Sequence, residues 1–116
     1  MATSPITVQS TQLTTSAATV LTSPAGFWTT TKKVTASNVS SSAVTVTVYK
    51  VASGGSAGST NTLIYQKTIP PNSINGGVVE LYEAENQTLA PGDTLQALCS
   101  AATSLNINIS AIEQTT

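Results

Sequence analysis

Histidine and arginine are both missing from this chain of 116 residues, and its four cationic side chains are all lysines. Without histidine the chain cannot build a Ser-His-Asp triad, a Cys-His pair or a histidine-ligated zinc site. Without arginine it lacks the planar fork that reads phosphates and guanine bases through paired hydrogen bonds. Because charged residues make up only 8% of the sequence and the formal net charge is -1, we expect neither nucleic acid nor a membrane as a partner.

Cysteine and long apolar runs are also scarce. Cys99 is the only cysteine, which rules out a disulfide within the chain. Its place on the inward face of an expected strand predicts a buried structural thiol rather than a nucleophile. No stretch approaches the roughly 20 apolar residues that span a bilayer. The first thirty residues lack the basic start and apolar run of a secretory signal, so we expect the protein to stay inside the cell until assembly.

Serine, threonine and asparagine supply the polarity of this sequence in place of charge. Threonine and valine both favour extended backbone, and apolar residues still make up 40% of the chain. A chain of this length buries roughly two-thirds of the surface that it exposes when unfolded. We therefore expect residues 1–116 to form a single domain with a loose N-terminus over about residues 1–5.

Alternating apolar and polar residues predict short strands separated by Pro, Gly and Asn turns. A single helical turn is expected at 83–88, and no segment has convincing helical periodicity. This pattern predicts an all-β fold, a two-layer antiparallel β-sandwich of jelly-roll or Greek-key type with about seven or eight short strands. The expected strands are 6–13, 18–21, 32–39, 43–51, 62–69, 78–82, 94–100 and 105–112.

The clearest pattern is SSSAVTVTVYKVASGGSAGST, which occupies residues 40–60. Val44, Val46 and Val48 share one face of the expected strand 43–51. The Gly- and Ser-rich segment 52–61 that follows is expected to be an exposed, mobile loop. Lysine, proline and bulge signals are sparse along 44–51, so we expect its edge to be covered in a homo-oligomer, of which a trimer is favoured.

Carboxylates cluster only at Glu80, Glu83, Glu85 and Asp93. Two of them could serve as the acid and base of a glycosidase, or the group could bind calcium together with Asn86. The cluster lacks the spacing of a known calcium loop, and carboxylates near a turn are more often solvated. The sequence therefore predicts no catalytic residue, no cofactor-binding residue, no metal ligand and no enzymatic activity.

Asn38, Asn86 and Asn108 each begin a match to the N-glycosylation pattern. In a chain so rich in serine and threonine, and without a secretory signal, we attribute these matches to chance.

Aromatic residues are rare, at 4% of the chain, and they are the candidates for contact with a partner. Trp28 follows a Pro-Gly turn and could stack on a sugar or anchor a protein, although an aromatic of the core or its rim is the plainer interpretation. The candidate partner contacts are Phe27, Trp28, Tyr49, Tyr65 and Tyr82.

Three stretches, ATVLTSPAGFWTTTKKVTASNVSSSAVTVTVYKV, TLAPGDTLQALCS and LNINISAIE, together resemble small β-sandwich proteins encoded among the virion genes of tailed bacteriophages. The resemblance extends from about Leu13 to Glu113. It consists of the paired strands around the Ser-Ser-Ala-Val turn, the Gly-Ser loop, the Pro-Gly-Asp turn and the final alternating strand.

The resemblance implies a structural protein of the virion without enzymatic activity, assembled in the cytoplasm of the host bacterium. The expected function is that of a decoration or cement protein that stabilises the shell by contacts with the major capsid protein or other virion proteins. An accessory subunit of the tail, collar or fibre attachment is the alternative within the particle. A carbohydrate-binding module that uses Trp28, Tyr65 or Tyr82 remains an alternative of a different class.

Overall fold

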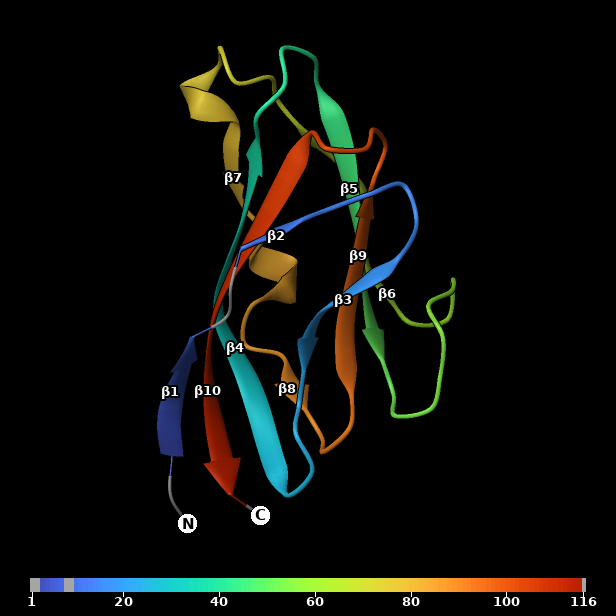
Figure 1. The fold of residues 1–116 in the computed structure, drawn as a ribbon, viewed down its shortest axis with the longest axis vertical. Coiled ribbons are helices and arrows are strands. Elements are labelled where there is room, and N and C mark those ends of the chain that lie inside the picture. Colours follow the sequence, from blue (N-terminus) through green and yellow to red (C-terminus); the bar gives the residue numbers. More distant parts are fainter. Residues whose placement is uncertain (1–2, 8–9, 116) are drawn as a thin grey trace.

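Two antiparallel sheets packed face to face make up the computed structural model, which describes residues 3–7 and 10–115 (Figure 1). The first sheet has the order β1-β10-β4-β7, with β2 also pairing with β10 and β8 with β4, and the second has the order β3-β9-β5-β6. The strands are β1 (Thr3–Thr7), β2 (Thr11–Gln12), β3 (Ala18–Thr22), β4 (Phe27–Asn38), β5 (Val44–Val51), β6 (Thr62–Ile69), β7 (Val78–Glu80), β8 (Thr88–Leu89), β9 (Thr94–Cys99) and β10 (Leu105–Thr115). The 3-10 turns are η1 (Asn75–Gly77) and η2 (Tyr82–Ala84).

The pairing of these strands gives the topology of a jelly roll. β1 and β2 are two pieces of one interrupted strand along β10, and β7 and β8 are two pieces of another along β4. Counted in this way, eight strands in chain order form a sheet 1-8-3-6 that faces a sheet 2-7-4-5. This order arises when two Greek keys are wound together. The expected all-β sandwich is confirmed, and the pairings supply the strand order.

The core lies between the sheets and is built by the period-two pattern of the sequence. On β10 the buried residues alternate with exposed or half-buried ones from Leu105 to Ala111, and β9 alternates in the same way. Each fully buried Val, Leu or Ile side chain contributes roughly 1.5–3 kcal/mol relative to leaving it exposed. The largest buried apolar side chains are Leu13, Ile69, Leu81, Leu89, Leu95, Leu105, Ile107, Val34, Val46, Val48 and Val51.

The N-terminus is more ordered than expected from the sequence. Residues 3–7 pair with residues 110–114 of β10 as strand β1, so the prediction of a loose segment over about residues 1–5 is wrong for residues 3–5. Residues 1 and 2 lie outside the described part of the chain. The expected strand at 6–13 is divided into β1 and β2.

Strand β4 begins at Phe27, five residues before its expected start at Lys32. Thr29 and Thr31 are fully buried there. The Thr29 hydroxyl donates to Ser23 Oγ at 2.9 Å, and the Thr31 hydroxyl donates to the Ala84 carbonyl at 2.7 Å. Threonine counts as polar in a hydrophobic pattern, so the sequence does not reveal inward-facing threonines whose hydroxyls are hydrogen-bonded inside the fold.

The strand at 44–51 is not an edge, because β5 pairs with β9 on one side and β6 on the other. The argument for a homo-oligomer from an uncovered edge at 44–51 is therefore wrong. The edges of this sheet are β3 and β6, and the register of β6 against β5 shifts twice. Gln66, at one of these bulges, has φ +50° and donates its N–H to Thr47 Oγ1. Bulges of this kind disrupt the ladder that another chain could extend.

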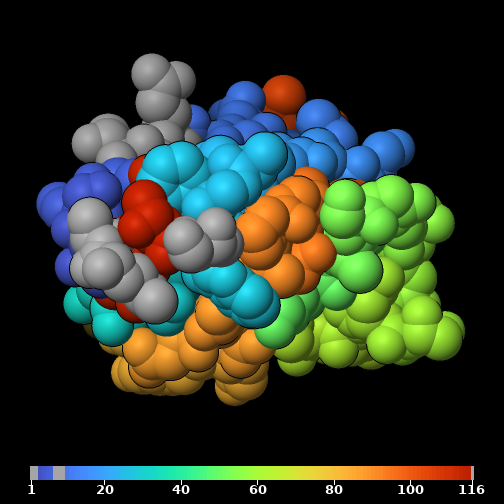
Figure 2. Space-filling view, turned by 90° about the horizontal axis from the view of Figure 1, so that it is seen from below, coloured from blue at the N-terminus to red at the C-terminus, as the bar shows by residue number. Residues whose placement is uncertain are grey.

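The loop 52–61 is exposed over residues 52–56 but is tied to the rest of the molecule. Ser53 N–H donates to Asp93 Oδ1 at 3.0 Å, and Lys50 N–H donates to the Asn61 carbonyl at 2.9 Å. Figure 2 shows the loop in green beside the 90–93 turn in orange. The expected exposure is present for these residues, and the expected mobility stays a prediction.

Candidate binding surface

Of the five candidate aromatic residues, the structure brings Tyr49 and Tyr65 together. Both line one groove on the outer face of the second sheet. Trp28 lies on the first sheet, cross-strand from Gln114, and is 43% exposed. Tyr82 lies on η2 and is 66% exposed. Trp28, Tyr65 and Tyr82 come from β4, β6 and η2, and η2 contacts both of these strands.

The groove has a volume of about 350 Å³ and is lined by Tyr49, Gly58, Ser59, Thr62 and Tyr65. Tyr49 on β5 faces Thr62 across the ladder, and the bulged segment of β6 carries Tyr65, whose surface is 73% exposed. None of the lining side chains is charged. An uncharged groove with aromatic walls favours a ligand or protein surface that presents apolar groups and neutral hydrogen-bonding groups.

One wall of the groove is held in place by hydrogen bonds around Asn61. Its side-chain oxygen accepts from Gly58 N–H at 2.9 Å, and its side-chain nitrogen donates to the Ser56 carbonyl at 2.9 Å. The Thr62 hydroxyl donates to the Gly58 carbonyl at 2.9 Å. These hydrogen bonds fix the conformation of residues 56–62 on this side of the groove, and fixing a wall in place lowers the entropy cost of binding.

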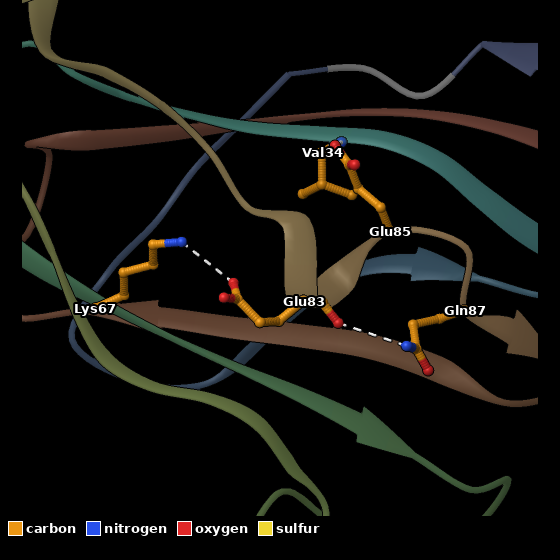
Figure 3. A network of polar contacts seen from close by, with 5 residues as sticks. All are labelled: Val34, Lys67, Glu83, Glu85 and Gln87. Carbon is orange, nitrogen blue, oxygen red and sulfur yellow. Dashed lines mark hydrogen bonds and ion pairs between the residues drawn. The ribbon is translucent and has the colours of Figure 1, made fainter.

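A second polar surface joins β6 to η2 (Figure 3). Lys67 Nζ lies 3.2 Å from Glu83 Oε1 and 5.8 Å from the centre of the Tyr82 ring. The Gln87 side chain donates to the Glu83 carbonyl at 3.4 Å. Hydrogen bonds from its own backbone and from Lys67 lower the pKa of the Glu83 carboxyl. Lys67 lies opposite Val46 in the β5–β6 ladder, and Val46 faces the core, so the Lys67 side chain lies on the inner face of this edge strand. An inward-pointing charge on an edge strand disfavours pairing with another chain.

Glu85 fills a gap in the first sheet. Its Oε2 accepts the N–H of Val34 at 3.1 Å, in the part of β4 that lies between its pairings with β7 and β8. Figure 3 shows where Glu85 and Val34 lie relative to the Lys67–Glu83 pair. Glu80 lies beside it, 3.9 Å from Lys33 Nζ. The hydrogen bond with Glu85 and, to a smaller extent, burial raise the pKa of the Glu80 carboxyl. Sequence reasoning assigned these carboxylates to the solvent and gave no sign that one of them completes the sheet.

Asp93 lies apart from the three glutamates. Its two carboxylate oxygens accept the N–H groups of Ser53 and Ala90, at 3.0 and 3.1 Å. The four carboxylates that are close in the sequence therefore have different surroundings in the structure. Asp93 binds the backbone of a turn, Glu85 binds β4 in the gap of the first sheet, and Glu80 and Glu83 each lie near a lysine. Among residues 3–7 and 10–115, no three His, Cys, Asp or Glu side chains are grouped so that they could hold a metal ion.

Cys99 is buried, as expected, with 1% of its surface exposed. Burial raises the pKa of its thiol, while Sγ donates to the Ala101 carbonyl at 3.0 Å. A raised pKa lowers the fraction of reactive thiolate. This thiol is poorly placed for nucleophilic chemistry or for a bond to another chain.

The outer face of the first sheet has a shallower hollow of about 280 Å³. It is lined by Lys33, Thr35, Asn108, Ile109 and Ser110, next to the register shift of β10 at Ser110. No helix in the described ranges is long and apolar enough to cross a membrane.

Comparison with known proteins reveals a likeness of fold. No model of a known protein family matches the chain. No curated protein sequence matches it either. Among solved structures, it is similar to a protein described with the disulfide-linked pili of Bacillus endospore appendages, with a TM-score of 0.53 and 16% identity. The likeness covers 98% of this chain and 87% of the other. At this identity it supports the sandwich fold alone.

Proposed function

We propose that this chain is a non-enzymatic structural subunit of a tailed-bacteriophage particle, a decoration or cement protein that holds neighbouring subunits together. The observation that carries the proposal is how charge is distributed on the jelly roll. Lys33, Lys67 and the four carboxylates between residues 80 and 93 all contact other groups of this chain. The groove on the outer face of the second sheet is lined by neutral polar and aromatic groups, which suits attachment by apolar burial and uncharged hydrogen bonds.

The Tyr49–Tyr65 groove is the contact surface that we assign to this function. An uncharged groove with an exposed tyrosine at its rim is the type of site that becomes an energetic centre of an interface. The jelly roll recurs in viral capsid proteins, and this supports the proposal by analogy of fold.

The test is binding of the purified protein to particles that lack it. We expect little change in attachment between low and high NaCl and no effect of a chelator, because ion pairs contribute little here. Tyr65→Ser is expected to weaken binding by about tenfold or more, as for an interface centre. Tyr82→Ser is the matched control, since Tyr82 is similarly exposed but lies outside the groove. Attachment that fails at moderate salt, or equal loss in both variants, would contradict the proposal.

A subunit of a bacterial surface filament is a second candidate, favoured by the likeness to the Bacillus pilus protein. That protein belongs to disulfide-linked pili, whereas Cys99 is the only cysteine here and is buried. Any filament of this chain would therefore be held by non-covalent contacts. Electron microscopy of the concentrated protein, with and without a reducing agent, tests this candidate: filaments that persist under reduction would support it over the phage assignment.

A further inference from the structure

Asn75 and Gly76 form the exposed tip of the connection between β6 and β7. Both residues are exposed and have positive φ, +49° and +70°. A Cβ built on Gly76 would meet no atom within 4 Å. Figure 1 shows the turn at the end of the sandwich opposite the two chain termini. The peptide bond between Asn75 and Gly76 is therefore accessible to solvent and to the side chain of Asn75.

We infer that Asn75 is a site of spontaneous deamidation. The reaction requires the backbone nitrogen of the next residue to reach Cγ of the asparagine. Glycine is the most permissive follower, because it has no Cβ to shield that nitrogen and adapts its backbone easily. This inference rests on the turn alone and is independent of the function proposed above.

The chemistry needs only water. The Gly76 nitrogen forms a bond to Asn75 Cγ, the bond from Cγ to the amide nitrogen breaks, and ammonia leaves with the proton of the Gly76 N–H. The product is a five-membered succinimide. Water then opens the ring at one carbonyl to give aspartate, or at the other to give isoaspartate, in which the backbone runs through the side chain.

Asn86 provides a comparison within the same molecule. It is also exposed and has φ +58°, but Gln87 follows it. The Gln87 N–H, which would have to attack, donates to Thr31 Oγ1 at 3.0 Å. A side chain on the following residue and an engaged N–H both oppose ring closure, so Asn86 is expected to be far less reactive.

Deamidation would change the surface around the turn. Ile74 and Val78 flank it with 51% and 50% of their surfaces exposed. A new carboxylate between them would make the formal net charge of the chain -2 instead of -1. A surface that docks by apolar contacts is weakened by a charge placed within it, because that charge must be desolvated.

The experiment follows the folded protein at 37 °C and mildly alkaline pH by peptide mapping with mass spectrometry and an isoaspartate assay. We expect amide-to-acid conversion at Asn75 at least about tenfold faster than at Asn86, a barrier difference of about 1.4 kcal/mol. Asn75→Gln should remove the fast reaction, because ring closure by the longer side chain is slower. The deamidation rate at Asn75 in the urea-unfolded protein gives the reactivity of the Asn-Gly sequence in the absence of the folded turn. Equal rates at Asn75 and Asn86, or an inert Asn75 in the folded protein alongside rapid conversion in the unfolded one, would overturn the inference.

Discussion

Asn38 lies at the end of β4 with 1% of its surface exposed, and its side chain connects two turns. Its amide nitrogen donates to the carbonyls of Ser42 and Pro70 at 2.8 and 3.0 Å. Its side-chain oxygen accepts the N–H and the hydroxyl of Ser40 at 2.9 and 2.8 Å. A buried amide with these partners is unavailable to a glycosylating enzyme, which agrees with the attribution of its sequence match to chance.

Asn38→Ala should lower the free energy of unfolding by about 2–3 kcal/mol, because the substitution leaves buried backbone groups without their partners. Urea denaturation measures this change. Asn108→Ala on the exposed side of β10 is the control and should change stability by no more than about 0.5 kcal/mol. Similar losses in the two variants would mean that the Asn38 hydrogen bonds do not stabilise the fold.

The segment from β7 to β8 shows how a strand can be interrupted without leaving its sheet. β7 and β8 pair with β4 at its two ends, and η2 covers the stretch between them. There, Thr31 N–H donates to the Gln87 carbonyl, Leu81 N–H donates to the Val34 carbonyl, and Glu85 accepts from Val34 N–H. The sheet is completed by side-chain and turn contacts where regular pairing stops.

Glu80→Gln should change the pH dependence of stability. Because the folded state raises the pKa of Glu80, its contribution is complete below the unfolded pKa and is lost as pH rises through the folded pKa. A glutamine can donate to Glu85 at every pH. The variant should therefore gain in melting temperature relative to the wild type as pH rises through that interval.

The lowered pKa of Glu83 gives the opposite dependence, a contribution lost as pH falls through its folded pKa. The wild type and the Glu80→Gln variant both contain Glu83, so its contribution cancels in the difference between their melting temperatures. The facing groups of Glu80 are Glu85 and Lys33. A difference in melting temperature that stays constant across pH would show that the Glu80–Glu85 contact has no energetic weight.

Hydrogen exchange should divide the loop 52–61 into protected and open amides. Protection is expected at Ser53, Gly55 and Gly58, whose N–H groups donate to Asp93, Ala52 and Asn61. The other amides of 52–60 should exchange faster, as expected for an exposed Gly-Ser segment. Uniformly fast exchange would mean that these hydrogen bonds open readily in solution, and Asp93→Ala should then have no effect on Ser53.

At the scale of the whole molecule, the edge strands of the two sheets affect how copies of this chain can associate. β6 is bulged and carries the inward Lys67, β3 has a register shift between Thr19 and Leu21, and β1 contains Pro5, which lacks an N–H. These features disfavour edge-to-edge pairing. Association of copies is better served by the outer faces of the sandwich.

We expect a homo-oligomer, with a trimer favoured, that assembles through these faces. Its mass in light scattering should be unchanged by a reducing agent, since Cys99 is buried, and should change little at high NaCl, since few charges are available. A monomeric mass over a wide concentration range would contradict this expectation. Loss of the oligomer on reduction would instead require Cys99 to become exposed.

Much of the architecture was predictable from local pattern. Alternation at Leu105–Ala111 or Thr94–Cys99 identifies strands because every second residue must enter the core. Thr29 and Thr31 escaped this rule because their hydroxyls find partners inside. β1 escaped it because its residues 3–5 are exposed, so pairing with β10 gives no apolar alternation. Tyr49 and Tyr65 were both candidates, but only the fold placed them in one groove.

The sequence by itself determined the all-β class and the buried Cys99, since both depend on which residues are apolar and how they alternate along one strand. It also determined how little charge the surface can carry. Only the tertiary structure decided the strand order and the interior position of β5. It also decided that Glu85 binds β4 in the gap of the first sheet and that Asp93 lies apart from the glutamates. Those features depend on pairings between segments far apart in the chain, and local periodicity does not encode which strand lies beside which.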